Sequence, residues 1–367
     1  MVQSQELMKL SKLGEFGLIE NIRKSTFRKS PSVLVGIGDD AAVMKMSPTA
    51  HLLATTDMLI EGVHFDLTYT DFYSLGWKSA AINLSDIAAM GGLPRYCLTS
   101  LGIPPSVSVE QIADFYRGLN ALLRRHQTAL VGGDTCSSPK SLLISVVALG
   151  EAPASREIRR EGARPGDRIF VSGTLGDSAA GLEILKAGSR GRGQGSGVRS
   201  REPGVRSKDV KSELRNPKSA VDSLIQKHLR PVPRVEWGRK IALSGCVNAM
   251  IDISDGLSSD LFHICEQSNV GAAVYAEKIP ISPALRRAAA HLGQSPIHYA
   301  LSGGEDYELL FTTPAAKIKK ILSFGLPVTE IGEITRTRKM LTVDGMGKTT
   351  AMRPSGYNHF ARSPYTR

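Results

Sequence analysis

The sequence of 367 residues lacks long apolar runs, and this absence excludes whole classes of protein. No stretch approaches the roughly 20 consecutive apolar residues that cross a bilayer, and the polar first residues contain no apolar run of signal-peptide length. The four cysteines, at positions 97, 136, 246 and 265, form no C-x-x-C pair and have no clustered histidines around them. This spacing argues against a disulfide framework or a zinc site. We therefore expect a cytoplasmic protein with reduced thiols.

Several catalytic motifs are missing as well. No nucleophile elbow, H-E-x-x-H pair or kinase catalytic loop occurs in the sequence. Gly347-Lys348-Thr349 resembles the end of a P-loop, but Thr342 stands where the first glycine of G-x-x-x-x-G-K-[ST] is required. We expect this stretch to be a hairpin or surface turn, so a nucleotide would have to be bound by other means.

The composition that is present is that of a soluble globular protein, with 41% apolar and 22% charged residues. The length suggests about two domains. The net charge of +11 suggests an acidic partner such as nucleic acid. However, residues 188–218 contain nine Lys/Arg and three Asp/Glu and almost no large apolar side chain. Because such a segment cannot offset its chain entropy by burial, we expect a disordered basic insertion, with a nucleic-acid or lipid tether as the alternative.

Apolar periodicity predicts alternating strands and helices. Strands are expected at Val33–Val35, Val43–Met46, Leu52–Thr56, Tyr96–Ile103, Ala129–Gly132, Ser141–Leu149, Arg168–Ser172 and Val247–Ile251, and helices at Leu7–Ser25, Ser74–Met90, Ser108–His126 and from Gly176 to Lys186. The continuous apolar run of Ser141–Leu149 predicts a strand buried on both faces.

The segment Gly36–Ala42 (GIGDDAA) follows a predicted strand and nearly matches the G-x-G-x-x-A dinucleotide fingerprint. Its adjacent carboxylates, Asp39 and Asp40, would repel bare phosphates unless a divalent cation lies between them. Asp39 either completes such a site or only stabilises the turn.

Further aspartates follow the ends of predicted strands or lie on a predicted helix. They are Asp57, Asp86, Asp134, Asp252 and Asp255. Each alone is explained as a helix cap or turn residue. Gathered together, carboxylates repel one another unless cations neutralise them. Carboxylates with Thr and Ser hydroxyls beside them suit Mg²⁺, which binds through a few carboxylates and substrate phosphates. The sequence therefore predicts a protein that holds a polyphosphate through metal ions.

Nine segments resemble, in the same order, those of the thiamine-monophosphate kinase family, within the aminoimidazole-ribotide-synthetase-like ATP-binding superfamily. They are Gly14–Glu20 (GEFGLIE), Gly36–Ala42 (GIGDDAA), Thr55–Phe65 (TTDMLIEGVHF), Asn83–Gly92 (NLSDIAAMGG), Gly132–Thr135 (GGDT), Gly176–Leu185 (GDSAAGLEIL), His228–Arg234 (HLRPVPR), Asp252–Leu261 (DISDGLSSDL) and Leu301–Phe311 (LSGGEDYELLF). The resemblance covers nearly the whole chain except residues 188–218.

The resemblance implies two α/β domains: an ATP- and Mg-binding, dimerising domain at residues 1–152, whose sheet closes a barrel across a dimer, and an α/β domain at 153–367. It also implies ATP-dependent phosphorylation of thiamine monophosphate to thiamine diphosphate, the last step in making that coenzyme, by direct in-line transfer assisted by several Mg²⁺ ions. No residue is assigned as a general base, because the attacking oxygen of a phosphate monoester is already largely ionised near neutral pH.

The resemblance also implies roles for individual residues. Those expected to hold Mg²⁺ are Asp40, Thr55, Thr56, Asp57, Asp86, Asp134, Asp252 and Asp255. Those expected to contact ATP are Gly133, Asp134, Arg160 and Ser254, and those expected to line the thiamine pocket are His64, Glu305 and Tyr357. The alternatives from the residues alone are that His64 is a surface or packing histidine and that Glu305 caps a helix after Gly303-Gly304.

Two related activities fit less well. Selenophosphate synthetases usually carry an N-terminal Cys-Lys type loop, and hydrogenase-maturation carbamoyl dehydratases a C-terminal cysteine, and this sequence has neither. A nucleic-acid-binding protein would show steeply salt-dependent affinity that requires residues 188–218, but that alternative leaves the acidic residues unexplained. We expect thiamine monophosphate and ATP as partners and a homodimer, without membrane or nucleic acid.

Overall fold

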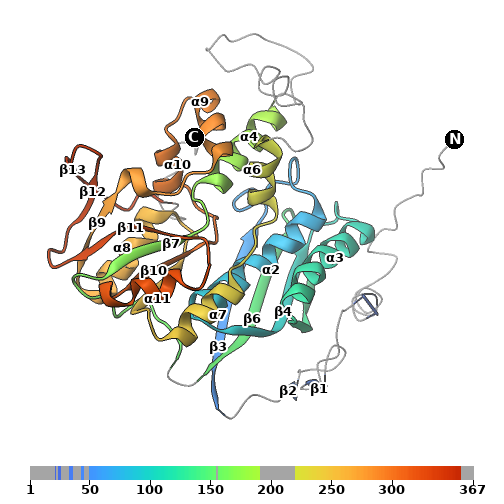
Figure 1. The fold of residues 1–367 in the computed structure, drawn as a ribbon. Coiled ribbons are helices and arrows are strands. Elements are labelled where there is room, and N and C mark those ends of the chain that lie inside the picture. Colours follow the sequence, from blue (N-terminus) through green and yellow to red (C-terminus); the bar gives the residue numbers. More distant parts are fainter. Residues whose placement is uncertain are drawn as a thin grey trace, which may run out of the picture. The chain divides into compact units, whose positions relative to one another are not determined.

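The computed structural model describes residues 21, 24–25, 33–35, 43–44, 49–153, 156–190 and 220–356 (Figure 1). Of these, the residues up to Glu157 together with Leu229–Gly245 form one compact unit, and Ile158–His228 with the residues from Cys246 onward form a second. Within the described ranges, no helix is long and apolar enough to cross a membrane. The predicted helix at Leu7–Ser25 falls outside the described residues except at positions 21, 24 and 25. The segment Gly36–Ala42 with Asp39, the basic insertion from residue 191 and the tail from Tyr357 also fall outside them.

The first unit has a small two-stranded sheet and a larger four-stranded one. Its elements are β1 (Val33–Val35), β2 (Val43–Met44), β3 (Ala50–Ile60), α2 (Phe72–Ala89), β4 (Leu93–Ile103), α3 (Val109–Arg125), β5 (Ala129–Ser137), β6 (Leu143–Pro153) and α7 (Val235–Ser244). The larger sheet has the order β3-β6-β4-β5, so β3 and β5 form its two edges. Only β4 and β5 pair in parallel.

Strand β6 corrects one prediction. Its residues alternate between buried and half-buried along the whole strand, so only one face is covered, where burial on both faces was expected. Buried Ile144, Val146 and Ala148 belong to the helix-covered core, while Val147 and Leu149 lie on the other face and are half-buried. An apolar run therefore does not require two covered faces when the second face is itself partly apolar.

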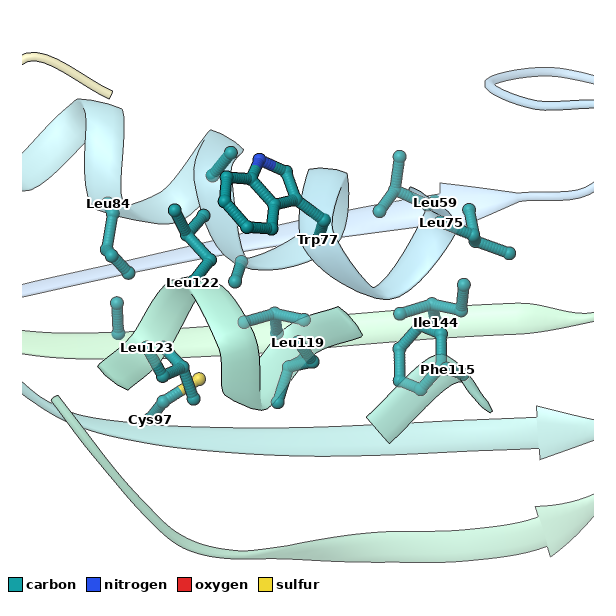
Figure 2. Packing of buried hydrophobic residues seen from close by; sticks show 14 of the residues in the cluster. Leu59, Leu75, Trp77, Leu84, Cys97, Phe115, Leu119, Leu122, Leu123 and Ile144 are labelled. Atoms are coloured by element: carbon teal, nitrogen blue, oxygen red, sulfur yellow. The ribbon is translucent and has the colours of Figure 1, made fainter. Parts of the chain in front are cut away.

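Helices α2 and α3 cover the core face of this sheet. Figure 2 shows Leu75, Trp77 and Leu84 of α2 packed among side chains of α3 and of the strands. The two helices approach closely at two glycines: a Cβ added to Gly76 would lie 1.9 Å from the carbonyl oxygen of Phe115, and one added to Gly118 would lie 1.8 Å from that of Tyr73. Any side chain at either position would force the helices apart.

Helix α7 explains why Leu229–Gly245 belongs to the first unit, where the sequence analysis had assigned it to the second domain. A Cβ on Gly238 would lie 2.1 Å from the carbonyl oxygen of Ala88, and one on Gly91 would lie 2.2 Å from the Cβ of Ala242. The helix therefore packs directly on the C-terminal end of α2. Trp77 donates its indole N–H to the carbonyl of Pro231 at 2.7 Å, which fixes the segment leading into α7.

The second unit is built on a seven-stranded sheet of order β13-β12-β9-β11-β7-β10-β8. Its elements are β7 (Arg168–Ser172), α4 (Asp177–Arg190), α6 (Ala220–Leu229), β8 (Ala249–Asp252), α8 (Leu257–Ser268), β9 (Gly271–Tyr275), η1 (Ala276–Lys278), α9 (Pro283–Leu292), α10 (Pro296–Ser302), β10 (Leu309–Thr313), η2 (Ala315–Lys317), α11 (Ile318–Leu322), β11 (Val328–Thr335), β12 (Met340–Val343) and β13 (Thr349–Ala351). Only β12 and β9 pair in parallel.

The P-loop-like stretch at Gly347 is a hairpin turn, as predicted. Strands β12 and β13 pair antiparallel, and the Asp344 side chain accepts hydrogen bonds from the backbone N–H groups of Met346 at 3.0 Å and Lys348 at 2.9 Å. An aspartate that accepts from the backbone two and four residues ahead stabilises a tight turn. This turn therefore holds its own backbone rather than a phosphate.

Candidate active site

In the first unit, three of the predicted residues meet between β3 and α2. Thr55 and Asp57 are two residues apart on β3 and so share a face, the one that buries Leu53 and Leu59. The Thr55 hydroxyl donates to Asp86 of α2 at 2.6 Å. Thr56 lies on the opposite face and is exposed. The strand was expected to end at Thr56, but it continues to Ile60 because pairing with β6 is unbroken as far as Leu143.

The carboxylate of Asp57 is poorly satisfied by protein groups. Its Oδ2 atom is buried and has no hydrogen-bond partner among the described residues. Burial, reinforced by the charge of Asp86, raises the pKa of Asp57 to about 7. An ionised oxygen that lacks a donor is costly in this position, and a divalent cation would offset that cost. This orphaned oxygen shows that the donor set fits Mg²⁺, which prefers carboxylate and hydroxyl oxygens.

His64 lies in the turn that follows β3. The backbone N–H of Ile60 donates to its Nδ1 atom at 3.0 Å, and a backbone N–H can only donate. Nδ1 must therefore be the unprotonated nitrogen, so a neutral His64 carries its proton on Nε2. Glu61 fixes the same turn by accepting from the backbone of Leu142 at 2.8 Å. The imidazole is thus oriented by the fold.

Gly133 and Asp134 lie at the other edge of the same sheet. The pairing register runs from Asp57 through Val146 and Thr99 to Gly133. Three strand spacings of about 4.8 Å place the two edges roughly 14 Å apart along the sheet. Asp134 is exposed and accepts from the backbone of Thr135 at 2.8 Å. Strand β5 was expected to end at Gly132 but continues to Ser137, so Asp134 is within a strand rather than after one.

In the second unit, Asp252 ends β8 and the turn from Ile253 to Gly256 leads into α8, as predicted. Asp260, which the sequence analysis did not single out, lies one turn into that helix. It is buried and accepts from the backbone N–H groups of Asp255 at 3.2 Å and Gly256 at 3.0 Å. Burial, followed by the charges of Asp252 and Asp255, raises its pKa. The carboxylates of Asp252 and Asp255 thus lie close enough to Asp260 to raise its pKa.

The segment from Gly303 to Glu308 packs its backbone against this turn. Glu305 N–H donates to Ser254 at 2.7 Å, and Tyr307 N–H donates to Ile253 at 2.9 Å. Glu305 and Tyr307 have φ angles of 65° and 51°, in the left-handed region that side chains rarely adopt. No helix follows Gly303-Gly304, so Glu305 is not the helix cap that its position suggested. The segment instead leads into β10.

Every acidic side chain of this segment has a protein partner. Asp306 accepts from the backbone N–H groups of Gly176 at 2.6 Å and Ser178 at 3.3 Å, at the start of α4. Burial raises its pKa to about 8. Glu308 accepts from the Ser172 hydroxyl at 2.5 Å and lies 3.6 Å from Lys227 Nζ. Glu305 Oε2 lies 3.3 Å from His228 Nδ1.

The remaining predicted residues are placed as follows. The carbonyl of Arg160 accepts from Ser268 at the C-terminal end of α8, about 18 Å along that helix from the Ser254 turn, so the second unit does not bring these two backbones together. Asp40 and Tyr357 lie outside the described residues. Gly356, which precedes Tyr357, donates to Ser259 at 2.9 Å and so lies at the start of α8.

The complete predicted metal set is not assembled in the described ranges, where no three His, Cys, Asp or Glu side chains gather tightly enough to hold an ion. Thr55, Asp57 and Asp86 form one group in the first unit. Asp252, Asp255 and Asp260 form another in the second unit.

Known proteins share this arrangement of domains. Family models for the AIR synthase related protein match here, the N-terminal domain at residues 38–152 and the C-terminal domain at residues 164–344. Thiamine-monophosphate kinase of Aquifex aeolicus is 38% identical over 96% of this chain and 100% of its own. The enzyme of the same name from Bacillus subtilis is 34% identical over 95% and 100% of the two chains. The chain belongs to the thiamine-monophosphate kinase family.

Solved structures agree with this family assignment. Thiamine-monophosphate kinase from Stenotrophomonas maltophilia K279a has a TM-score of 0.73 at 35% identity, covering 90% of this chain and 95% of its own. The AaThiL complex with AMPPCP and TMP has a TM-score of 0.70 at 38% identity, covering 97% and 100%. This chain therefore has the two-domain AIR-synthase-related fold, and its two larger sheets have four and seven strands.

The sequence analysis missed the acidic residues whose hydrogen bonds fix the loops around the site. Asp260, Asp306 and Glu308 all lie within quoted motifs, but nothing local distinguishes them from turn or surface acids. The signal exists only in the fold, because Asp306 accepts from residues about 130 positions away. The aspartate of GDSAAGLEIL also has a structural part, since Asp177 accepts from Thr174 and Ser282 at 2.7 and 2.5 Å.

Proposed function

We propose that this chain phosphorylates thiamine monophosphate to thiamine diphosphate, taking the phosphoryl group from ATP by direct in-line transfer. The proposal rests on family membership together with the orphaned oxygen of Asp57. Thr55, Asp57 and Asp86 present hydroxyl and carboxylate oxygens at one point. One of these oxygens is buried and has no donor in the part of the chain that the structure describes. Among the described residues, the buried acids Asp260 and Asp306 accept from backbone N–H groups, so the unpaired oxygen of Asp57 distinguishes this group.

The residues that would hold Mg²⁺ are the two acidic groups, with Asp40, Thr56 and Asp134 added by resemblance. When bound, Mg²⁺ would screen the repulsion between the donor and acceptor phosphates and take up negative charge during transfer. The protein's own part is to position the two substrates. His64 is presented in one tautomer by Ile60, and Glu305 supplies a carboxylate that suits the positive charge of the thiazolium ring.

A homodimer belongs to the same proposal. The outer face of the four-stranded sheet exposes Leu52 and Met58, at 55% and 57% of their surfaces. Two such faces would close into a barrel and bury this surface. Light scattering after gel filtration tests the dimer, and a monomer at micromolar concentration would contradict it.

The decisive experiment is a direct assay with purified protein, Mg-ATP and thiamine monophosphate, with thiamine diphosphate measured by chromatography. The matched controls are Asp57→Asn and unphosphorylated thiamine as the acceptor. We expect product from the wild type only, and only from the monophosphate. If ATP binds but no diphosphate forms, the acceptor assignment is wrong, and other phosphate and carboxylate acceptors should be tested with the same protein.

A further inference from the structure

We propose that His228 is a positioning residue for substrate recognition: it holds the Glu305 carboxylate in the orientation that receives the cationic ring of the substrate. This inference rests on the proposed function, which gives Glu305 its role. His228 is the last residue of the second unit before the chain enters the first, and the sequence analysis quoted it only as part of the motif HLRPVPR.

The contact is built from a buried donor and a partly open acceptor. His228 Nδ1 lies 3.3 Å from Glu305 Oε2 and 3.2 Å from the Ser178 hydroxyl. Only 3% of the His228 side chain is exposed, against 27% of the Glu305 side chain. The histidine therefore engages one oxygen of the carboxylate from the protein side, while part of the carboxylate stays open to a ligand.

The Nδ1 atom of His228 lies near two oxygen atoms, that of the Ser178 hydroxyl and Oε2 of Glu305. The hydroxyl can donate or accept, so it suits either protonation state of Nδ1, whereas an ionised carboxylate can only accept. In this proposal His228 carries its proton on Nδ1, because an unprotonated Nδ1 would face the lone pairs of the carboxylate. Ser178 is itself fixed, because its backbone N–H donates to Asp306. The imidazole is therefore held from both the α4 side and the carboxylate side.

The backbone of Glu305 alone does not orient its side chain. The main chain is anchored to Ser254 and adopts a positive φ of 65°, but the rotatable bonds of the side chain are not fixed by that anchor. Lys227, next to His228, lies 3.6 Å from Glu308, so the C-terminal end of α6 places two nitrogen donors against two acids of the same segment. Helix α6 thus sets the positions of these carboxylates, and a preoriented carboxylate binds a cation with less loss of side-chain freedom.

The test compares two substitutions of similar size and no charge. His228→Asn keeps an N–H donor near the position of Nδ1, whereas His228→Gln moves its amide farther from the backbone. We expect His228→Gln to raise KM for thiamine monophosphate on the order of tenfold, with KM for ATP and kcat changed less than about twofold. His228→Asn should recover most of the loss. His291→Leu, at an exposed histidine of α9, is the control.

Equal effects of Asn and Gln, or parallel losses in both KM values and in kcat, would overturn the proposal, because a merely structural histidine would give them. Adding Glu305→Gln to His228→Gln should cost little more than either change alone, since both act on one contact. Nitrogen NMR of labelled histidine gives a readout that needs no turnover: the Nδ1–H signal of His228 should shift in Glu305→Gln. An inactive wild type with this shift present would refute the proposed function but not the contact, and absence of the shift would refute the contact.

Discussion

The two acidic groups of this protein differ in how their carboxylates are satisfied. In the first unit, Asp57 has a buried oxygen with no donor among the described residues, beside the negative charge of Asp86. In the second unit, Asp260 accepts two backbone N–H groups, and so does Asp306, which lies outside that group. Both groups contain carboxyls of raised pKa, so a raised pKa alone does not separate them. The hydrogen-bond partners of the carboxylates do separate them.

This difference indicates that some of the carboxylates stabilise the fold and others bind a cation. A carboxylate that is satisfied by the backbone contributes to the fold and fixes a loop, whereas one that is left without donors requires a cation. Removing Asp57 and removing Asp260 or Asp306 should therefore have opposite consequences: a loss of activity with the fold intact for Asp57, and a loss of stability for Asp260 or Asp306.

The largest effect is expected for Asp57→Asn. Because the amide cannot replace a carboxylate toward Mg²⁺, kinase activity should fall by about 10²- to 10³-fold. The melting temperature of the metal-free protein should stay the same or rise, since a buried unpaired charge is removed. Activity assays and thermal unfolding of the same preparation check both parts. A marked drop in melting temperature would mean that Asp57 has a structural role and that the contrast between the units is wrong.

Asp306→Ala should instead lower the stability of the protein. It leaves the N–H groups of Gly176 and Ser178 without their acceptor in a buried place, which costs about 2–4 kcal/mol of unfolding free energy. Urea unfolding measures this loss. Asp306→Asn keeps one acceptor oxygen and should lose clearly less. Equal stabilities of the two variants would show that the cap at the start of α4 contributes nothing.

The pH dependence of stability should separate Asp57 from the other acids. The folded state holds the Asp57 proton up to about pH 7, while the unfolded carboxyl releases it near 3.8. The free energy of unfolding of the metal-free protein should therefore fall as the pH rises from about 4 to 7. Asp57→Asn should flatten part of that slope, and saturating Mg²⁺ should reduce it in the wild type. Parallel curves for the wild type and the variant in chelator would contradict the raised pKa.

A smaller effect is expected for Thr55→Val, which removes the hydroxyl that donates to Asp86. Loss of a hydrogen bond to a charged group should lower activity about tenfold. Thr55→Ser keeps the hydroxyl and should stay close to the wild type. Steady-state kinetics at varied Mg²⁺ should show whether the loss is recovered at high metal concentration, as expected if Thr55 orients a ligand carboxylate.

The smallest effect is expected from replacing residues 191–219 with a short Gly-Ser linker. This segment lies between motifs, so kcat and both KM values should change less than about twofold. A large fall in activity would show that the basic insertion contributes to the site.

Apolar periodicity and turn residues predicted those elements that depend only on neighbouring residues in the sequence. Strand β7 has the predicted bounds, and the Asp252–Gly256 turn joins a strand to a helix because Asp-Gly suits such a turn. The length of β3 could not be predicted in the same way. Thr55-Thr56-Asp57 has the polarity of a strand end, yet the ladder with β6 continues. The Asp86 carboxylate of α2 accepts from the Thr55 hydroxyl, so this polar side chain has a partner within the sheet-helix core.

The site was predictable as a set of residue types but not as a geometry. The acids of the first unit were found from their motifs, but their separation depends on strand order, which places Asp57 and Gly133 at opposite edges. His228 carried no signal of its own, because its partner Glu305 is 77 positions later and both depend on the packing of α6. Contacts of this kind follow from tertiary structure and not from periodicity.

The first unit is formed by two segments of the chain that are separated by part of the second unit, and this has a consequence for synthesis on the ribosome. Helix α7 is made after about a third of the second unit, yet it covers α2 of the first. The first unit therefore cannot complete its core as soon as Glu157 has emerged; its last helix arrives almost 90 residues later. A fragment that ends at Glu157 should expose the Ala88 and Gly91 surface of α2 and aggregate. A chimera that joins the first 157 residues of one relative to the rest of another should fold poorly for the same reason, because α2 and α7 would come from different proteins.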